Sequence, residues 1–276
     1  MKFSLILPTY NRFIEITAFL DSLSNQSYKN FELIVVDQNQ NNKIDNLCEN
    51  YHYPITIIKS KTRVLSINRN IGLNHASGEI IAFPDDDCEY DPLTLEKILS
   101  FFNNNPDYNY YTCNTIDKYT QKSIFSGLSS NTEISKINFM RTGVSITIFT
   151  KEKAIKSFKF DEQLGIGAKF GSGEESDLLL YLLKNKNKGK YISNDYIYHP
   201  NTSITKERAS SYGKGFGAVF KKGITVYHFY QLFPLYVLYL FKSLLNILVY
   251  KDKKCCIAIL QGRISGFIQY KYPANA

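Results

Sequence analysis

Three consecutive carboxylates, Asp85, Asp86 and Asp87, follow a short apolar run at residues 80–83. The run predicts a buried strand, and Pro84 ends it because proline has no N–H for a further ladder bond. Three like charges at a strand end repel one another, so a cation, arginines or full exposure to water must offset the repulsion. Clustered carboxylate oxygens are typical ligands of Mg²⁺ or Mn²⁺, and an acidic surface turn is the simpler alternative.

A second acidic group, Glu174, Glu175 and Asp177, follows a segment with four glycines at residues 161–173. The glycines predict a flexible loop, and the apolar run at 178–183 predicts a helix after it. Acidic residues in a first helical turn favour the helix dipole, so capping alone accounts for this group.

The elements that would carry the acidic triplet alternate regularly through the first hundred residues. Apolar runs predict strands at residues 3–7, 31–36, 54–58 and 80–83, and helical spacing predicts helices at 13–23, 65–76 and 95–102. This alternation is typical of an α/β fold with a parallel sheet and helices on both faces. Ligands of such sheets bind at the carboxyl ends of the strands. Thr9, Asp37 and the acidic triplet all follow strand ends, so we expect them to converge on one edge.

The second half of the chain contains fewer clear patterns. We expect strands at residues 108–112, 144–150 and 191–198, with a turn at 141–143. The sequence is basic and glycine-rich at residues 210–222 and then strongly apolar at 227–250. The predicted organisation is therefore one domain at 1–205 and an amphipathic or hydrophobic helical region at 206–276.

The apolar region at 227–250 has two explanations, and the sequence favours neither over the other. Its helices either lie at a membrane interface and contact anionic lipid, or cover the core as an ordinary hydrophobic pair. A membrane span is a third and less favoured option, because Pro234 and Lys242 interrupt the apolar stretch.

Composition fits a globular protein of 276 residues with 44% hydrophobic and 21% charged residues. The net charge of +8 suggests an anionic partner: nucleic acid, a phosphorylated small molecule or a membrane surface. Nucleic acid is disfavoured because no recognition motif occurs. Five scattered cysteines and the lack of a signal-peptide pattern predict a cytoplasmic protein. With the apolar C-terminal region, the expected location is peripheral, on the inner face of the cell membrane.

Four segments carry a family resemblance: LILPTYNR, FELIVVDQN, INRNIGLNHASGEIIAFPDDD and GSGEESDLLLYLL, in this order over roughly residues 1–200. Together they resemble the family 2 inverting glycosyltransferases of the GT-A fold, of the type that builds bacterial polysaccharides. The resemblance implies a metal-dependent enzyme that moves a sugar from a nucleotide-sugar, with a UDP-sugar expected, to a hydroxyl of a glycan or lipid-linked acceptor.

The resemblance also implies which residues bind the donor. The turn after the first strand and the end of the second would hold the nucleotide, with nearby arginines and acids on the sugar and diphosphate. The donor-binding candidates are Pro8, Thr9, Tyr10, Arg12, Asp37, Gln38, Arg63, Arg69, Asp85 and Asp86. Gln38 stands where the family commonly has a second acid. Its amide oxygen can still accept from a uracil N3–H, but the departure leaves the base open.

Metal-binding and catalytic roles follow from the same match. Asp85 and Asp87 match the acidic motif that holds Mg²⁺ or Mn²⁺, and His199 lies where related enzymes place a diphosphate or metal contact. Inversion needs one base that deprotonates the acceptor hydroxyl. The pair Glu174-Glu175 stands where the family has Glu-Asp, so Glu175 is the expected base and Asp177 the second candidate.

Two other functions are weighed against this one. A sugar nucleotidyltransferase would need a glycine-rich phosphate loop after the first strand, and the sequence PTYNR there contains no glycine. A non-enzymatic nucleic-acid-binding protein would need its phosphate partner to avoid the acidic triplet. The oligomeric state is left open.

Overall fold

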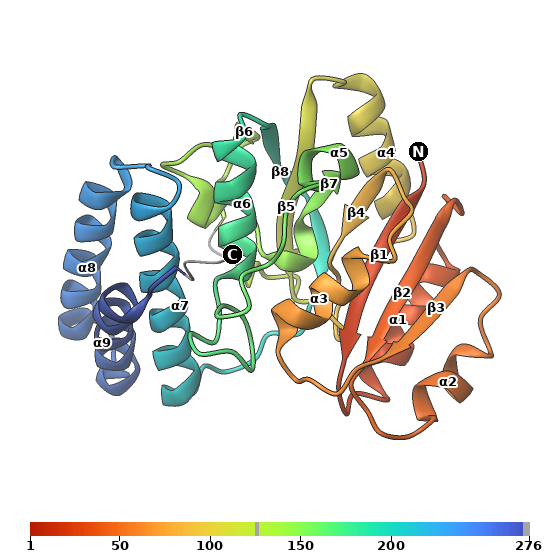
Figure 1. The fold of residues 1–276 in the computed structure, drawn as a ribbon, viewed down its shortest axis with the longest axis horizontal. Helices are drawn as coiled ribbons and strands as arrows, with labels where there is room; N and C mark the ends of the chain where they lie inside the picture. The colour runs from red at the N-terminus through yellow and green to blue at the C-terminus, as the bar shows by residue number, and fades with distance from the viewer. Residues whose placement is uncertain (125–126, 273–276) are drawn as a thin grey trace. The chain divides into compact units, whose positions relative to one another are not determined.

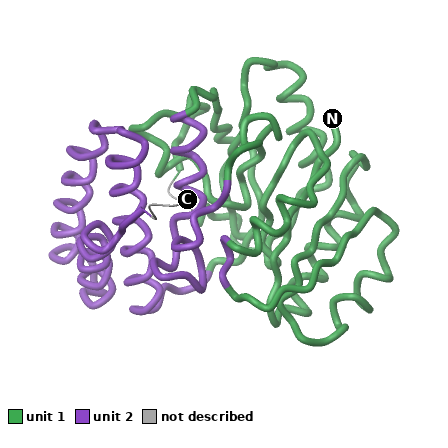
Figure 2. Tube along the Cα trace, in the orientation of Figure 1, with its two compact units in different colours: residues 1–63, 67–158, 185–201 green, residues 64–66, 159–184, 202–276 purple. Residues whose placement is uncertain are grey.

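A computed structural model describes residues 1–124 and 127–272. The chain forms two compact units (Figure 2). Unit 1 comprises residues 1–63, 67–158 and 185–201, and unit 2 comprises 64–66, 159–184 and 202–276. The predicted domain boundary after residue 205 stays a prediction, and residues 273–276 of its second region lie outside the described residues.

Unit 1 is built on a sheet that contains eight strands among the described residues, in the order β3-β2-β1-β4-β7-β5-β8-β6 (Figure 1). The strands are β1 (Phe3–Thr9), β2 (Phe31–Asp37), β3 (Ile55–Lys59), β4 (Ile80–Ala82), β5 (Tyr108–Ile116), β6 (Thr132–Glu133), β7 (Phe149–Lys151) and β8 (Lys188–Tyr198). The β1–β2, β2–β3, β1–β4 and β5–β8 pairs are parallel, whereas β7 and β6 pair antiparallel with their neighbours. The expected mostly parallel α/β sheet is confirmed.

The helices of unit 1 place apolar stripes on this sheet. They are α1 (Glu15–Ser24), α2 (Lys43–Cys48), most of α3 (Leu65–Leu73), α4 (Thr94–Asn104) and α5 (Glu152–Ile155), with short 3-10 turns η1 (Phe139–Arg141) and η2 (Ser145–Thr147). Phe19 and Leu20 of α1 and Leu95 of α4 lie in one buried cluster with Leu5 and Leu7 of β1. Full burial of such a side chain stabilises the fold by about 1.5–3 kcal/mol, so these stripes fix both helices on the sheet.

Two predicted boundaries in unit 1 were wrong. We expected the first strand to end before Pro8, but β1 continues to Thr9, with Pro8 opposite Val36 and Thr9 opposite Asp37. On the other side of β1, pairing with β4 reaches only Leu5, so a proline beyond that point interrupts no ladder on that side.

The strand expected at 144–150 is also shorter than its β-branched composition suggested. Residues 145–147 form the 3-10 turn η2, and only Phe149–Lys151 pairs as a strand. The Thr147 hydroxyl lies 3.1 Å from the Val144 nitrogen and 2.9 Å from its carbonyl oxygen. These local hydrogen bonds outweigh the strand propensity of the segment.

Unit 2 is helical: α6 (Glu174–Lys184), α7 (Lys206–Thr225), α8 (Leu232–Val249) and α9 (Lys253–Gln269). The expected C-terminal helices are confirmed, and Figure 1 shows α7, α8 and α9 in blue as neighbours. Close α7–α9 packing depends on glycines, because a Cβ on Gly217 would lie 2.1 Å from the Arg263 carbonyl oxygen and one on Gly266 2.0 Å from that of Lys214.

Candidate functional site

The ends of β1 and β4 meet at the acidic triplet. The Thr9 hydroxyl, on the last residue of β1, donates to an Asp86 oxygen at 2.8 Å. Because β1 and β4 run parallel, their carboxyl ends lie at the same edge of the sheet. The expected convergence of the first strand end with the triplet is therefore confirmed.

Each carboxylate of the triplet has a cationic partner. Arg69, whose side chain is fully buried, donates to Asp85 at 3.0 Å. Arg12 lies 3.6 Å from Asp86 and forms a short ion pair with Asp87. The Nε2 atom of His199 lies 3.1 Å from Asp87. Arginines and a histidine thus offset the repulsion of the three carboxylates, which is one of the solutions that the sequence allowed.

The three carboxyl groups differ in their proton affinity. Burial raises the pKa of Asp86 to about 7; the Thr9 hydrogen bond and Arg12 oppose the rise, and the neighbouring Asp85 and Asp87 add to it. Burial acts in the same direction on Asp87, but His199 and Arg12 outweigh it and lower the pKa of that carboxyl. Asp87 is thus held as an anion, whereas Asp86 titrates near neutral pH.

A divalent cation fits the group formed by Asp85, Asp87 and His199. One ligand atom from each lies within 4.8 Å of the others. The Nδ1 atom of His199 lies 2.8 Å from the Pro200 carbonyl oxygen, and donation to that oxygen would leave the Nε2 lone pair free to bind a metal. Histidine ligands commonly use their second nitrogen in this way. Two carboxylate oxygens and one imidazole suit Mn²⁺, with positions left for phosphate oxygens.

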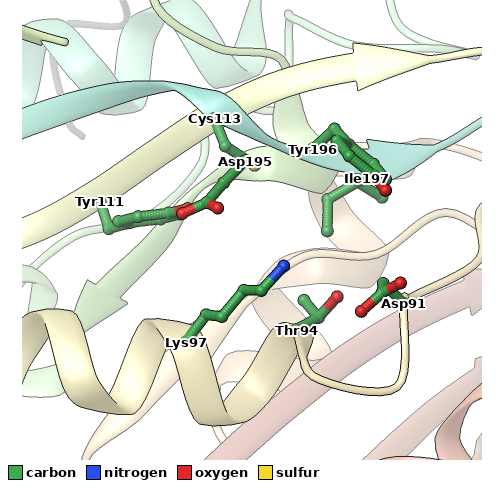
Figure 3. Close-up of a pocket in the computed structure, with 8 residues that line it drawn as sticks. All are labelled: Asp91, Thr94, Lys97, Tyr111, Cys113, Asp195, Tyr196 and Ile197. Carbon is green, nitrogen blue, oxygen red and sulfur yellow. The ribbon is translucent and has the colours of Figure 1, made fainter.

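Two cavities of unit 1 differ in volume, and the larger one lies at this site. A cavity of about 150 Å³ is lined by Asp87 and His199 together with Glu89 and Tyr198. A second cavity, of about 10 Å³, lies between α4 and β8, and Figure 3 shows the Lys97 side chain extending toward it. That volume holds about one water molecule, so it offers no room for a sugar or a nucleotide.

Asp37, at the end of β2, is fully buried and both of its oxygens are engaged. One accepts from the backbone N–H and side-chain amide of Asn39, at 2.8 and 2.7 Å, and the other accepts from Lys59 at 2.7 Å. The neighbouring Gln38 N–H donates to the Thr9 carbonyl at 3.0 Å, which links the ends of β1 and β2. Asn39 and Lys59 were not among the site residues predicted from the sequence. Lys59 directly follows the strand predicted at 54–58 and is the last residue of β3, so the strand-end rule that selected Asp37 could have found it.

The remaining donor-binding candidates occupy distinct environments. Pro8 is buried within β1. The Tyr10 ring is half-buried and carries the Arg63 guanidinium 4.3 Å from its centre. This stacked pair gives Arg63 a fixed position, although its side chain is exposed.

In unit 2 the acidic residues at the start of α6, Glu174, Glu175 and Asp177, differ in how deeply they are buried. Asp177 is fully buried and accepts from Lys222 at 2.7 Å and from Tyr227 at 2.8 Å. Lys222 also bonds Asp161 at 3.0 Å, so Asp177 belongs to an ion-pair cluster inside the unit. Glu174 is buried and Glu175 is half-buried. Of the three acids, Glu175 is therefore the one most accessible to a ligand.

The loop before α6 needs its glycines. Gly165, Gly167, Gly171 and Gly173 have φ values of 93, 81, 70 and 96°, a region that other residues rarely adopt. The loop is thus a defined path that leads the chain into the first turn of α6.

Comparison with known proteins places these features in a family. The family model described as "Glycosyl transferase family 2" matches residues 4–164, more than half of the chain. A curated relative, the GalNAc(5)-diNAcBac-PP-undecaprenol beta-1,3-glucosyltransferase of Campylobacter jejuni, is 28% identical over 194 residues, covering 67% of this chain and 60% of the relative. The chain spans about two thirds or less of the length of the first curated relatives it matches.

Two solved structures have a similar fold. Residues 1–349 of TarS from Staphylococcus aureus, in complex with UDP-GlcNAc, match with a TM-score of 0.67 and 19% identity, covering 98% of this chain and 74% of that one. The mannosyltransferase PcManGT from Pyrobaculum calidifontis, in complex with GDP-Man and Mn²⁺, matches with a TM-score of 0.66 and 14% identity, covering 98% and 88%. The chain therefore belongs to glycosyltransferase family 2, with a mostly parallel α/β sheet of the GT-A type.

Proposed function

We propose that this chain transfers a sugar, with a hexose from a UDP-sugar as the expected donor, to a hydroxyl of a glycan or lipid-linked acceptor in cell-surface polysaccharide synthesis, with inversion. The observation that carries the proposal is the ligand group of Asp85, Asp87 and His199 within a family 2 chain. The TarS structure with UDP-GlcNAc and the Campylobacter relative that acts on an undecaprenol-linked acceptor support the two substrate classes.

The residues divide the work of donor binding. Asp85, Asp87 and His199 would hold Mn²⁺ or Mg²⁺, which would neutralise charge on the departing diphosphate. Arg12 and Arg69 keep the acidic ligands in place through their ion pairs. Asp37, fixed by Asn39 and Lys59, and the Tyr10–Arg63 pair are the candidates for contacts with the nucleoside.

The chemical step requires one base. We assign it to Glu175, which accepts the proton of the acceptor hydroxyl as that oxygen attacks the anomeric carbon. The bond from this carbon to the diphosphate oxygen breaks, and the nucleoside diphosphate leaves with the electron pair. Attack from the face opposite the leaving group inverts the anomeric configuration. Asp177 is less suited to the role, because Lys222 and Tyr227 occupy its oxygens inside unit 2.

Two substitutions test this assignment. We expect Asp87→Ala and Glu175→Gln each to lower sugar transfer by roughly 10²–10⁴-fold, the usual contribution of a metal-ligand or general-base group. The readout is release of nucleoside diphosphate together with the glycoside product, and its anomeric configuration measured by NMR. The matched controls are the exposed acids Asp107→Ala and Glu162→Gln, which should keep wild-type turnover.

Two results would contradict the proposed roles. Wild-type turnover in Asp87→Ala or in Glu175→Gln would remove that residue from the mechanism. Release of pyrophosphate in place of nucleoside diphosphate would identify a nucleotidyltransferase and overturn the proposed reaction.

A further inference from the structure

Helix α8 exposes a continuous apolar face. Its outward side chains recur three or four residues apart and leave roughly half or more of their surface uncovered, including Phe233, Leu238, Phe241, Leu244 and Leu248. By length and composition alone, α8 is long and apolar enough to cross a membrane, and only 17% of it is buried. An exposed apolar stripe of this extent marks an interaction surface.

Two polar side chains of α8, Ser243 and Tyr236, face the opposite way, into unit 2. Ser243 is buried and accepts a hydrogen bond from Arg263 of α9. Arg263 also donates to the Tyr239 carbonyl at 2.8 Å, and the Tyr236 hydroxyl donates to the Arg263 carbonyl at 3.0 Å. A helix that faces water has the reverse arrangement. Polar groups turned toward the protein interior, with apolar ones outside, suit an apolar medium.

The charge of the chain is concentrated in the same region. Residues 202–276 hold eleven of the 33 basic residues and two of the 25 acidic ones, a net charge of +9, so residues 1–201 carry −1. Lys242 of α8 and Lys251, Lys253 and Lys254 beside its end are all exposed. A second copy of the chain docked symmetrically on this face would bring like charges together. Anionic lipid headgroups complement them.

Packing within unit 2 favours an α8 that lies parallel to the membrane surface over one that crosses the membrane. Its 18 residues span about 27 Å. However, Tyr236 stacks on Phe267 of α9 at 4.4 Å and contacts Phe220 of α7 at 5.6 Å. Because α7 also carries Lys222 with its buried ion pairs, a crossing α8 would draw charged groups into hydrocarbon.

We propose that α8 lies in the headgroup–acyl boundary of an anionic membrane such as the inner face of the cell membrane, with the face of Phe233, Leu238, Phe241, Leu244 and Leu248 toward the lipid. The flanking lysines contact the headgroups, and Ile264 and Ile268 of α9 are further exposed apolar side chains of unit 2. This inference does not depend on the proposed sugar transfer.

Sedimentation of the full-length chain with vesicles tests the proposal. We expect it to bind vesicles of phosphatidylcholine with 30% phosphatidylglycerol, to bind pure phosphatidylcholine far less, and to dissociate at high salt. The triple variant Leu238→Ser, Phe241→Ser, Leu248→Ser should lose binding by more than tenfold, whereas the equally exposed Ile14→Ser, Ile137→Ser double variant should bind normally.

Charge variants test the proposed contact between these lysines and anionic headgroups. Changing Lys251, Lys253 and Lys254 to Gln should weaken binding to anionic vesicles on the order of 100-fold, at roughly one decade or less per lysine. The matched control changes the exposed Lys153, Lys156 and Lys159 to Gln and should bind as the wild type does. The Asp87→Ala variant should also bind fully, which separates this test from that of the proposed function.

Three results would overturn the proposal. The first is equal vesicle binding by the wild type and the serine triple variant. The second is a dimer in solution that the serine variant converts to a monomer while no vesicle binding occurs, because the occupant would then be a second copy. The third is resistance of membrane-bound chain to alkaline carbonate, because that would indicate a span.

Discussion

At the scale of single residues, the acidic triplet is three different groups. Asp85 pairs with the buried Arg69, Asp87 pairs with Arg12 and His199, and Asp86 accepts a hydrogen bond from the Thr9 hydroxyl. Adjacent positions with one chemical identity therefore have separate tasks. Asp85 and Asp87 suit metal binding, and Asp86 suits the support of the strand end.

The raised pKa of Asp86, about 7, gives a stability prediction. An acid whose folded pKa is raised stabilises the fold below its ordinary pKa of about 4, and this contribution is lost as pH rises through 7. Asp86→Asn removes the buried charge, so without metal it should be the more stable protein at pH 8. We expect on the order of 2 kcal/mol, or about 4–8 °C in Tm, and no gain at pH 4.

Thermal melts in EDTA at several pH values measure this difference. The exposed Asp107→Asn is the matched control and should leave the melting curve unchanged at every pH. A constant difference between Asp86→Asn and wild type from pH 4 to 8 would show that the Asp86 carboxyl titrates normally.

At the scale of elements, strand ends and helix contacts set the positions of these residues. Parallel pairing of β4, β1, β2 and β3 brings the triplet, Thr9, Asp37 and Lys59 to strand ends at one edge of the sheet. In unit 2, α7 and α9 approach closely enough that backbone meets backbone, and glycine is the residue that permits this approach.

Gly217→Ala tests the α7–α9 contact. The added Cβ would lie 2.1 Å from the Arg263 carbonyl oxygen, so the helices must separate. Alanine gains about 1 kcal/mol of helix propensity, but overpacking costs about 1–3 kcal/mol, and a rigid backbone neighbour favours the upper end. We expect a net loss of about 1–2 kcal/mol in urea unfolding. Ser100→Ala, on the exposed side of α4, is the control and should change stability by a few tenths; an equally small effect of Gly217→Ala would contradict the close packing.

At the scale of the whole molecule, charge and chemistry are divided along the chain. Residues 1–201 carry the acidic triplet and a net charge near zero, whereas residues 202–276 carry the positive charge and the apolar face of α8. The proposed transfer from a charged, soluble donor to a lipid-linked acceptor would use both properties.

Donor binding at the level of the intact protein is measurable by thermal shift. We expect a UDP-sugar with Mn²⁺ to raise Tm by more than GDP-, CMP- or dTDP-sugars do, because a ligand that binds only the folded state stabilises it. EDTA should remove most of the shift. The Asp87→Ala variant should show little Mn²⁺-dependent shift and Asp107→Ala a normal one. A larger shift with another nucleotide-sugar would reassign the donor, as the Gln38 departure allows.

The sequence by itself determined the α/β alternation, the mostly parallel sheet and the convergence of Thr9 with the triplet, because strand and helix periodicity and the strand-end rule are local properties of the chain. The sequence motifs also identified the glycosyltransferase family. Only the tertiary structure decided which partner each acid has. The pairs Arg69–Asp85, Lys59–Asp37 and Lys222–Asp177 join residues 16, 22 and 45 positions apart, distances at which local pattern holds no information. The same reason explains α8: its composition predicted an apolar helix, but only packing against α7 and α9 determined which face remains exposed.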